Sequence, residues 1–310
     1  MKTISRILGV LLAIILAFQG YGYAANMESF GMISAGVGAE RETGGPSGCT
    51  NLATAQQIFS NTDVFKPHAC AGQPGARGMA SVLGVMPFAM QDLGLQLGAN
   101  YNGGDGSRFG ATLGPVFGWT GGKAGVILDY RFRTHGNSHF FWLTPAVSIY
   151  SGDLNFNLSY TQQMSSIQIK TKFLPNAESP SEVSNRWETR YVPYNRLQGS
   201  VSYFPMNSME LNVGLQVNTF AGQTKDIRSA GVGPVFAVAW MPINNIQLNL
   251  VKGTFDNRSR YNVQSGVSWV FNTGSAAATN LKEIRRKYLQ IPEPGVSVVG
   301  PHSGKLVFHP

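Results

Sequence analysis

One short segment contains the residue types of a nucleophilic catalytic site. His135-Gly136-Asn137-Ser138-His139 places two imidazoles beside a hydroxyl, and a histidine can act as the general base that activates a serine nucleophile. His135 and Ser138 are three residues apart, and in a β-strand such residues point to opposite faces. Glycine and asparagine between them also favour a turn. The spacing therefore indicates a turn between strands rather than a catalytic pair.

The two cysteines offer a second kind of chemistry. Cys49 and Cys70 lie in one polar stretch that also contains His68. Two cysteines and one histidine are an incomplete ligand set for a structural zinc ion. In an exported protein the simplest interpretation is a disulfide that closes a loop. A metal site and two free thiols are the alternatives, and we expect no cofactor.

The composition limits the kind of protein that could position these residues. Of the 310 residues only 13% are charged, about half of the usual quarter for a soluble globular chain. No internal apolar run approaches the ~20 residues of a transmembrane helix. These features argue against a coiled coil, a charged disordered chain and a helical membrane protein, and they favour an all-β protein.

Alternation with a period of two dominates the chain from Phe30 to Phe271. In 154–161, Leu, Phe, Leu and Tyr alternate with Asn, Asn, Ser and Thr, and 211–218 follows the same pattern. Each strand therefore has one apolar face and one polar or small face. The polar face carries Asn, Gln, Ser, Thr and Gly, whereas a soluble sandwich would carry Lys and Glu. The strands are also long enough for the ~9–11 residues that cross a bilayer at a tilt.

The pattern predicts a transmembrane antiparallel β-barrel of about twelve strands, spanning 25–271, with its apolar face against lipid. We place the strands at 29–40, 77–86, 91–102, 107–119, 123–133, 139–150, 153–164, 195–204, 209–220, 227–240, 244–255 and 259–271. Alternate connections are tight, and the others include two long loops, 41–76 and 165–194. Short periplasmic turns and longer extracellular loops are typical of the bacterial outer membrane, so we expect contacts with its lipids and lipopolysaccharide.

The N-terminus predicts export. Two basic residues precede the apolar stretch 8–18, and Gly22 and Ala24 are small residues suited to cleavage before Ala25. We expect 1–24 to be a signal peptide, because an apolar stretch this short is a poor single-pass anchor. No basic run is interleaved with aromatic residues, so we expect no nucleic-acid binding.

Strand parity points six charged side chains into the lumen of the barrel. They are Arg108, Asp129, Arg131, Arg133, Arg196 and Arg260. Four of the five arginines come at the extracellular ends of their strands, where a ring of positive charge would concentrate anions. The alternatives are ion pairs with carboxylates such as Asp105, Asp129 or Asp256, and contacts with lipopolysaccharide phosphates.

Residues 272–310 differ in kind from the barrel. Asn280 with Glu283 three residues later is typical of a capping box, and Leu281 and Ile284 share one helical face. We expect a short periplasmic tail with one helix. The tail is either poorly ordered or carries a helix that enters the lumen or docks a periplasmic partner.

At the level of architecture, residues 25–271 resemble a Gram-negative outer-membrane β-barrel. The segment 261–271 resembles the aromatic-ended last strand that the barrel-assembly machinery reads in that class. The resemblance implies that Tyr261, Trp269 and Phe271 form the assembly signal and that this machinery is a partner. In that class the signal usually ends the chain, whereas here 39 residues follow.

Three functions fit such a barrel. The first is a channel for passive diffusion of small polar or anionic solutes. The second is a surface-exposed interaction or adhesion protein that uses loops 41–76 and 165–194 on a plugged barrel. The third is a lipid hydrolase, because the segment from His135 to His139 resembles the His-x-Ser arrangement of barrel phospholipases and lipid A deacylases. Here the spacing is His-x-x-Ser, so we expect a channel and not an enzyme.

The cysteine pair yields a direct test. If Cys49 and Cys70 are joined, thiol labelling of the denatured, non-reduced protein will find no free cysteine. Closing a loop of about 20 residues is worth ~3 kcal/mol in the chain-entropy model. Because the loop lies outside the strand ladder, reduction should leave the barrel folded. Two labelled thiols in protein taken from its native membrane would reject the pair.

Overall fold

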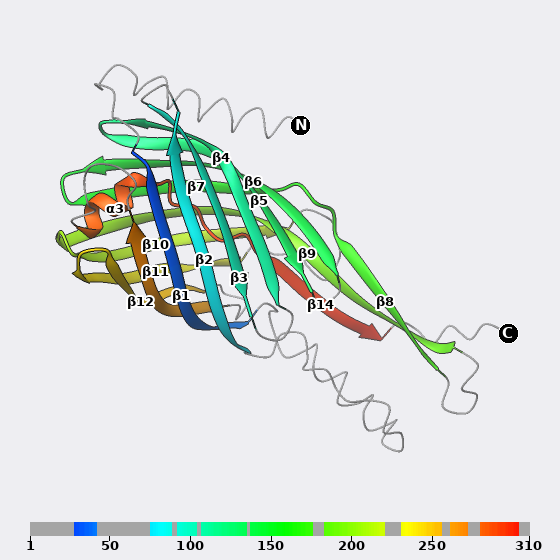
Figure 1. Cartoon of the computed structure of the whole chain (residues 1–310). Helices are drawn as coiled ribbons and strands as arrows, with labels where there is room; N and C mark the ends of the chain where they lie inside the picture. Colours follow the sequence, from blue (N-terminus) through cyan, green and yellow to red (C-terminus); the bar gives the residue numbers. More distant parts are fainter. Residues whose placement is uncertain are drawn as a thin grey trace.

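The computed structural model (Figure 1) describes residues 28–41, 75–88, 92–103, 107–134, 137–175, 183–220, 231–255, 261–271 and 280–303. The signal peptide, Cys49, Cys70, His135 and Arg260 lie outside these residues. The described elements are β1 (Phe30–Arg41), β2 (Gly75–Pro87), β3 (Leu93–Asn102), β4 (Arg108–Trp119), β5 (Gly122–Arg133), β6 (Ser138–Ser151), β7 (Leu154–Gln163), β8 (Gln168–Pro175), β9 (Val183–Met206), β10 (Met209–Phe220), β11 (Gly231–Ile243), β12 (Ile246–Phe255), β13 (Tyr261–Phe271), α3 (Leu281–Lys287) and β14 (Val296–Ser303).

Twelve of the described strands, β1 to β7 and β9 to β13, form a closed antiparallel barrel. Each strand pairs with the next along this series, and β13 pairs with β1 from Gly31↔Phe271 to Arg41↔Tyr261. Closure leaves no barrel strand with an unpaired edge, which a bilayer requires because lipid offers no hydrogen-bond partners. The predicted twelve-stranded transmembrane barrel is therefore confirmed.

The barrel wall is apolar outside and polar inside. On β10, Val213 and Leu215 are each 64% exposed, whereas Gln216 and Asn218 are 3% and 1% exposed. Apolar side chains facing outward all round a closed barrel are stable against lipid. The protein therefore belongs in the bacterial outer membrane. No helix in the described part of the chain is long and apolar enough to cross a membrane.

The two ends of the barrel differ in their connections. One end, called here the short-turn end, has two-residue turns such as Gly152-Asp153 and Asn244-Asn245. Gly152 and Asn245 have φ of 56° and 72°, in the left-handed region that such tight hairpins use. The opposite end is called the long-loop end. In outer-membrane barrels these ends face the periplasm and the exterior, respectively.

The region expected as the extracellular loop 165–194 contains strands that the sequence pattern did not predict. β8 pairs with the first part of β9, with Gln168 opposite Tyr191 and Leu174 opposite Asn185. In Figure 1 this hairpin extends beyond the rest of the barrel. The sequence of 183–190 is mostly polar, so it carries no period-two apolar signal, and its strand is fixed by backbone pairing.

The chain after β13 returns into the barrel. The predicted cap is present, because the Asn280 side chain accepts a hydrogen bond of 2.8 Å from the Glu283 backbone N–H at the start of α3. Figure 1 shows α3 at the short-turn end and the following segment running through the barrel. That segment ends in β14, which pairs with β9 from Val296↔Pro193 onwards. Residues 288–303 thus do not remain in a periplasmic tail.

The fold predicts an electrophoretic signature. A barrel closed by backbone hydrogen bonds around its whole circumference should resist detergent until it is boiled. Unboiled protein should therefore migrate differently from boiled protein, and its circular dichroism should be dominated by β-structure. Identical migration together with a helical spectrum would contradict the fold.

Candidate functional site: the lumen and its C-terminal segment

An apolar core closes the short-turn end of the lumen. Leu281, Ile284 and Leu289 are each 0% exposed, and they pack against inward-facing apolar residues of the wall, among them Phe30 and Phe204. These inward positions are apolar here, unlike the polar positions nearer the long-loop end. The apolar face of α3 is therefore buried inside the barrel, which explains why this segment does not stay outside.

The basic residues of α3 hold its position by polar contacts. Lys282 Nζ lies 2.6 Å from an Asp153 carboxylate oxygen, and Arg285 Nε lies 2.5 Å from Glu210. Arg286 donates to the Gly152 carbonyl oxygen at 2.7 Å.

The contact between Lys282 and Asp153 has a defined pH dependence. The hydrogen bond from the Lys282 ammonium, together with its charge, holds the pKa of Asp153 below its ordinary value. The contact is therefore complete above the ordinary pKa of an aspartate and is lost as the pH falls through the lowered value.

The segment beyond α3 has its backbone groups satisfied by the wall. Gln96 donates from Nε2 to the Leu289 carbonyl oxygen at 3.0 Å and accepts from the Leu289 N–H at 2.8 Å. Lys123 donates to the Lys287 carbonyl oxygen at 3.1 Å. Buried backbone groups outside regular structure need such partners. The wall of the barrel therefore provides specific sites for this segment.

Glu293 is the main polar contact of the segment near the long-loop end. Its carboxylate accepts from Asn102 Nδ2 at 3.0 Å and from Arg131 Nη1 at 3.2 Å. Its carbonyl oxygen accepts from Arg196 Nη1 at 2.7 Å. Val296 then packs with Phe140, Trp142 and Tyr191. We call residues 288–296 the lumen segment, because they connect one end of the barrel to the other.

The charged residues predicted to face inward lie on the inner wall where the structure describes them. Arg131 forms a two-point ion pair with Asp129 at 2.6 and 3.0 Å. Arg108 pairs with Glu40. Arg196 donates to Asn218 at 2.9 Å. The ion-pair alternative therefore holds for Arg108 and Arg131.

Arg133 and Arg260 are the remaining arginines of this set. Arg133 is 4% exposed and lies 5.8 Å from the Tyr191 ring centre, a distance that fits a cation–π contact. Arg260, Asp105 and Asp256 are outside the described residues. Wall or segment groups thus hold the described arginines, so they do not form an open ring of free positive charge.

Sequence reasoning missed three carboxylates that pair with arginines inside the barrel. Glu40 follows the parity of Ser34 on the inner face of β1, so its position was predictable. Glu210 has the inward parity of Asn212 on β10. Glu293 lies between two prolines in a segment without periodicity, and no sequence signal places it inside a barrel.

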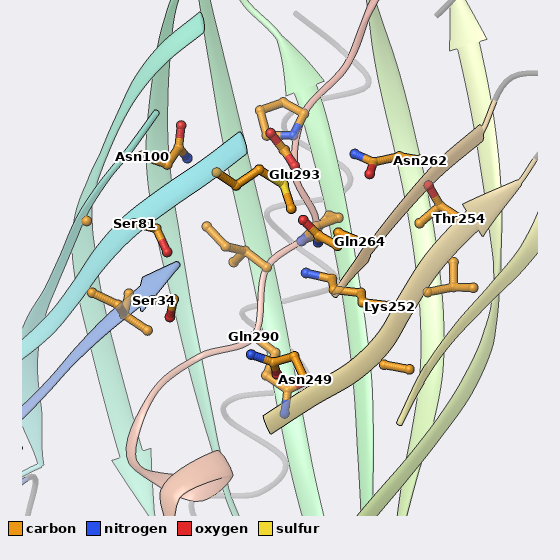
Figure 2. A pocket seen from close by; sticks show the side chains of 18 of the residues that line it. Ser34, Ser81, Asn100, Asn249, Lys252, Thr254, Asn262, Gln264, Gln290 and Glu293 are labelled. Carbon is orange, nitrogen blue, oxygen red and sulfur yellow. The ribbon is translucent and has the colours of Figure 1, made fainter. Parts of the chain in front are cut away.

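Beside the lumen segment lies a cavity of about 420 Å³. This volume is within the ~300–1,000 Å³ range of small-molecule sites. Figure 2 shows amide and hydroxyl side chains directed toward the cavity from several strands, with Gln290 and Glu293 of the lumen segment on one side. The labelled wall residues are Ser34, Ser81, Asn100, Asn249, Lys252, Thr254, Asn262 and Gln264. The polar half of the lumen therefore retains unfilled space.

The segment with catalytic residue types does not assemble a site among its described members. Ser138 is 0% exposed, whereas His139 is exposed and its Nδ1 lies 2.8 Å from the Tyr130 hydroxyl. The two side chains point to opposite faces of β6, as their adjacent positions require. Within the described ranges, no three His, Cys, Asp or Glu residues gather as a metal site.

Comparisons with known proteins bear on the fold. No family model and no curated protein matches the chain. A structure from a study of in-meso crystallization of membrane proteins aligns with a TM-score of 0.52 and 8% identity, covering 87% of this chain and 99% of the other. An outer membrane channel from Pseudomonas putida F1 gives 0.48 and 10%, covering 81% and 98%. The KdgM porin gives 0.44 and 8%, covering 77% and 99%. The first likeness supports the overall fold.

The apolar core predicts how the lumen segment can be loosened. Leu289→Ala removes a fully buried side chain, and such changes cost about 2–5 kcal/mol. Leu289 is not part of the strand ladder. Its loss should therefore weaken the binding of the lumen segment to the wall and leave the barrel intact. Trypsin should then cleave at Arg285 to Lys287 faster, while unboiled protein still migrates as a folded barrel. Leu215→Ala, on the lipid face, is the matched control. Equal cleavage of both variants would show that Leu289 does not hold the segment.

Proposed function

We propose that this protein is an outer-membrane channel for small polar solutes, with a C-terminal segment that restricts its own lumen. The observation that carries the proposal is the polar cavity inside the closed barrel. Eight strands already leave room for interior side chains, and larger barrels enclose cavities or channels. Burying polar groups is costly unless they are hydrogen bonded. A wall of amides and hydroxyls around unfilled space therefore supports contact with water and polar solutes.

Helix α3 and the start of the lumen segment restrict passage in the described structure. At the short-turn end, Leu281, Ile284 and Leu289 fill the barrel together with apolar wall residues. A solute that crosses the barrel must therefore pass a position occupied by α3. Conduction accordingly depends on displacement of α3 or of the lumen segment. The barrel wall itself does not have to change, since its strands are held by the backbone ladder.

A second candidate function is display of an interaction surface outside the cell. The observation that favours it is the three-stranded sheet of β8, β9 and β14, because β9 continues well beyond the residues that pair with β7. In this reading the barrel is an anchor and the lumen segment is a permanent plug. The long loop 41–76, of which 42–74 lie outside the described residues, would contribute to the same surface.

We also propose that the last barrel strand, β13, is read by the barrel-assembly machinery through Tyr261, Trp269 and Phe271. Its pairing with β1 completes the barrel, and Trp269 is 55% exposed on the outer face. An aromatic side chain on that face is accessible to a protein that receives the strand in the membrane.

Planar-bilayer recording separates the two functions. The full chain should show closed channels or rare openings, because α3 fills the short-turn end. A variant lacking residues 272–310 should show steady current, with the change of migration on boiling as proof that it is folded. Full-length Leu289→Ala should open more often than Leu215→Ala. A folded truncation that carries no current would reject the channel and leave the anchor reading.

A further inference from the structure

Lys252 reaches the lumen because of an irregularity in β12. Strict alternation from Gln247 and Asn249, which line the cavity, would turn Lys252 outward, on the same face as Leu250. The register shifts between Asn249 and Lys252: these residues pair with Gly266 and Gln264 of β13, so three steps on β12 match two on β13. The pairing with β11 shifts at the same place. One extra residue on one strand defines a β-bulge.

The bulge changes which side chains of β12 face inward. Leu250, before the shift, is 49% exposed on the lipid side. After the shift Lys252 and Thr254 line the cavity, and Phe255 is exposed outside. Bulges commonly re-aim a side chain at a functional position. In Figure 2 the Lys252 side chain extends from β12 toward the lumen segment.

The described charges that line the cavity are not equal in number. The cations are Arg108, Arg131, Arg196, Lys252 and Arg285, and the carboxylates are Glu40, Asp129, Glu210 and Glu293. Among the lining residues that the structure describes, five positive charges against four negative charges give a net charge of +1. Each carboxylate has an arginine partner, and Arg196 is held by the Glu293 carbonyl oxygen and Asn218. Lys252 makes no hydrogen bond or ion pair with any residue that the structure describes. Among the described lining residues, Arg196 and Lys252 are thus the cations without a carboxylate partner, and Lys252 is the one of the two that makes no hydrogen bond.

The groups around this charge suit a hydroxylated ligand. Gln264 is the cross-strand partner of Lys252, and both line the cavity with Asn249 and Asn262. Gln290, on the lumen segment, has a buried Nε2 without a hydrogen-bond partner among the described atoms. Amides offer both donors and acceptors, whereas a lysine offers only donors and a charge. One free cation matches a monoanion, and the amides match hydroxyl groups.

We propose that Lys252, with the surrounding amides, forms a binding subsite for a small polyhydroxylated carboxylate in the lumen. That the ligand passes through the barrel rests on the proposed channel function. Binding of the ligand needs only the cavity. It differs from the arginine ring considered from the sequence, because those arginines are already engaged. The anion preference of the lumen is therefore assigned to a single lysine of β12.

Calorimetric titration of the full chain in detergent at low salt tests the subsite. Gluconate and sorbitol are the probes, because they share a polyol chain and differ in the carboxylate. Wild-type protein should bind gluconate at least about tenfold more tightly than sorbitol, the range expected for one charge-assisted contact. Lys252→Gln should abolish this difference, whereas Lys252→Arg should retain most of it. Lys170→Gln makes the same charge change in β8, outside the barrel ladder, and should leave it intact.

Two outcomes would overturn the subsite: equal gluconate affinity in wild-type and Lys252→Gln protein, or no preference of the wild type for gluconate over sorbitol. Migration before and after boiling shows that each variant is folded, so loss of binding cannot be mistaken for unfolding. Failure of the channel proposal can be distinguished from failure of the subsite proposal. Binding by a barrel whose truncation carries no current rejects the channel alone, and current without gluconate binding rejects the subsite alone.

Discussion

The absence of hydrogen-bond partners in lipid is the constraint on which this structure depends. Every backbone N–H and C=O of a strand in the membrane must find a partner in another strand, so the sheet must close. Pairing of β13 with β1 satisfies that requirement with twelve strands. Closure at this size also creates an interior that wall side chains do not fill. The interior then has to be occupied by water, by solutes or by another part of the chain.

This protein uses part of its own chain for one half of the interior and leaves space in the other. At the short-turn end, apolar wall residues and α3 form a core like that of a soluble domain. Toward the long-loop end, the lumen segment makes individual polar contacts through Glu293 and its neighbours. The two halves of the interior differ in the free energy needed to displace the chain from the wall. Displacing α3 exposes apolar surface to water, whereas water can replace many of the polar contacts.

How much of this could be predicted from the sequence depends on which rule governs each element. Alternation predicts β10 at 209–220 without error, because its apolar face meets lipid and its polar face meets the lumen. The hairpin of β8 and β9 does not have an apolar face against lipid and a polar face toward the lumen. Its strands are therefore determined by backbone pairing alone. Asn280 and Glu283 predict the start of α3, since capping is local. The route of the residues that follow depends on contacts with distant strands, such as that between Gln96 and Leu289, and no local pattern contains it. Lys252 is missed for a further reason: one inserted residue reverses the parity that the prediction assumes.

The route of the lumen segment also constrains the order in which the protein can be assembled. α3 lies at one end of the barrel and β14 pairs with β9 toward the other, so the connecting residues pass through a ring of backbone hydrogen bonds. Such an arrangement has two possible histories. Either β14 is threaded end-on through a finished ring, or it pairs with β9 while the seam between β1 and β13 is still open. In the second history the seam closes around a strand that is already in place, and the C-terminal residues act as a core on which the wall is wound.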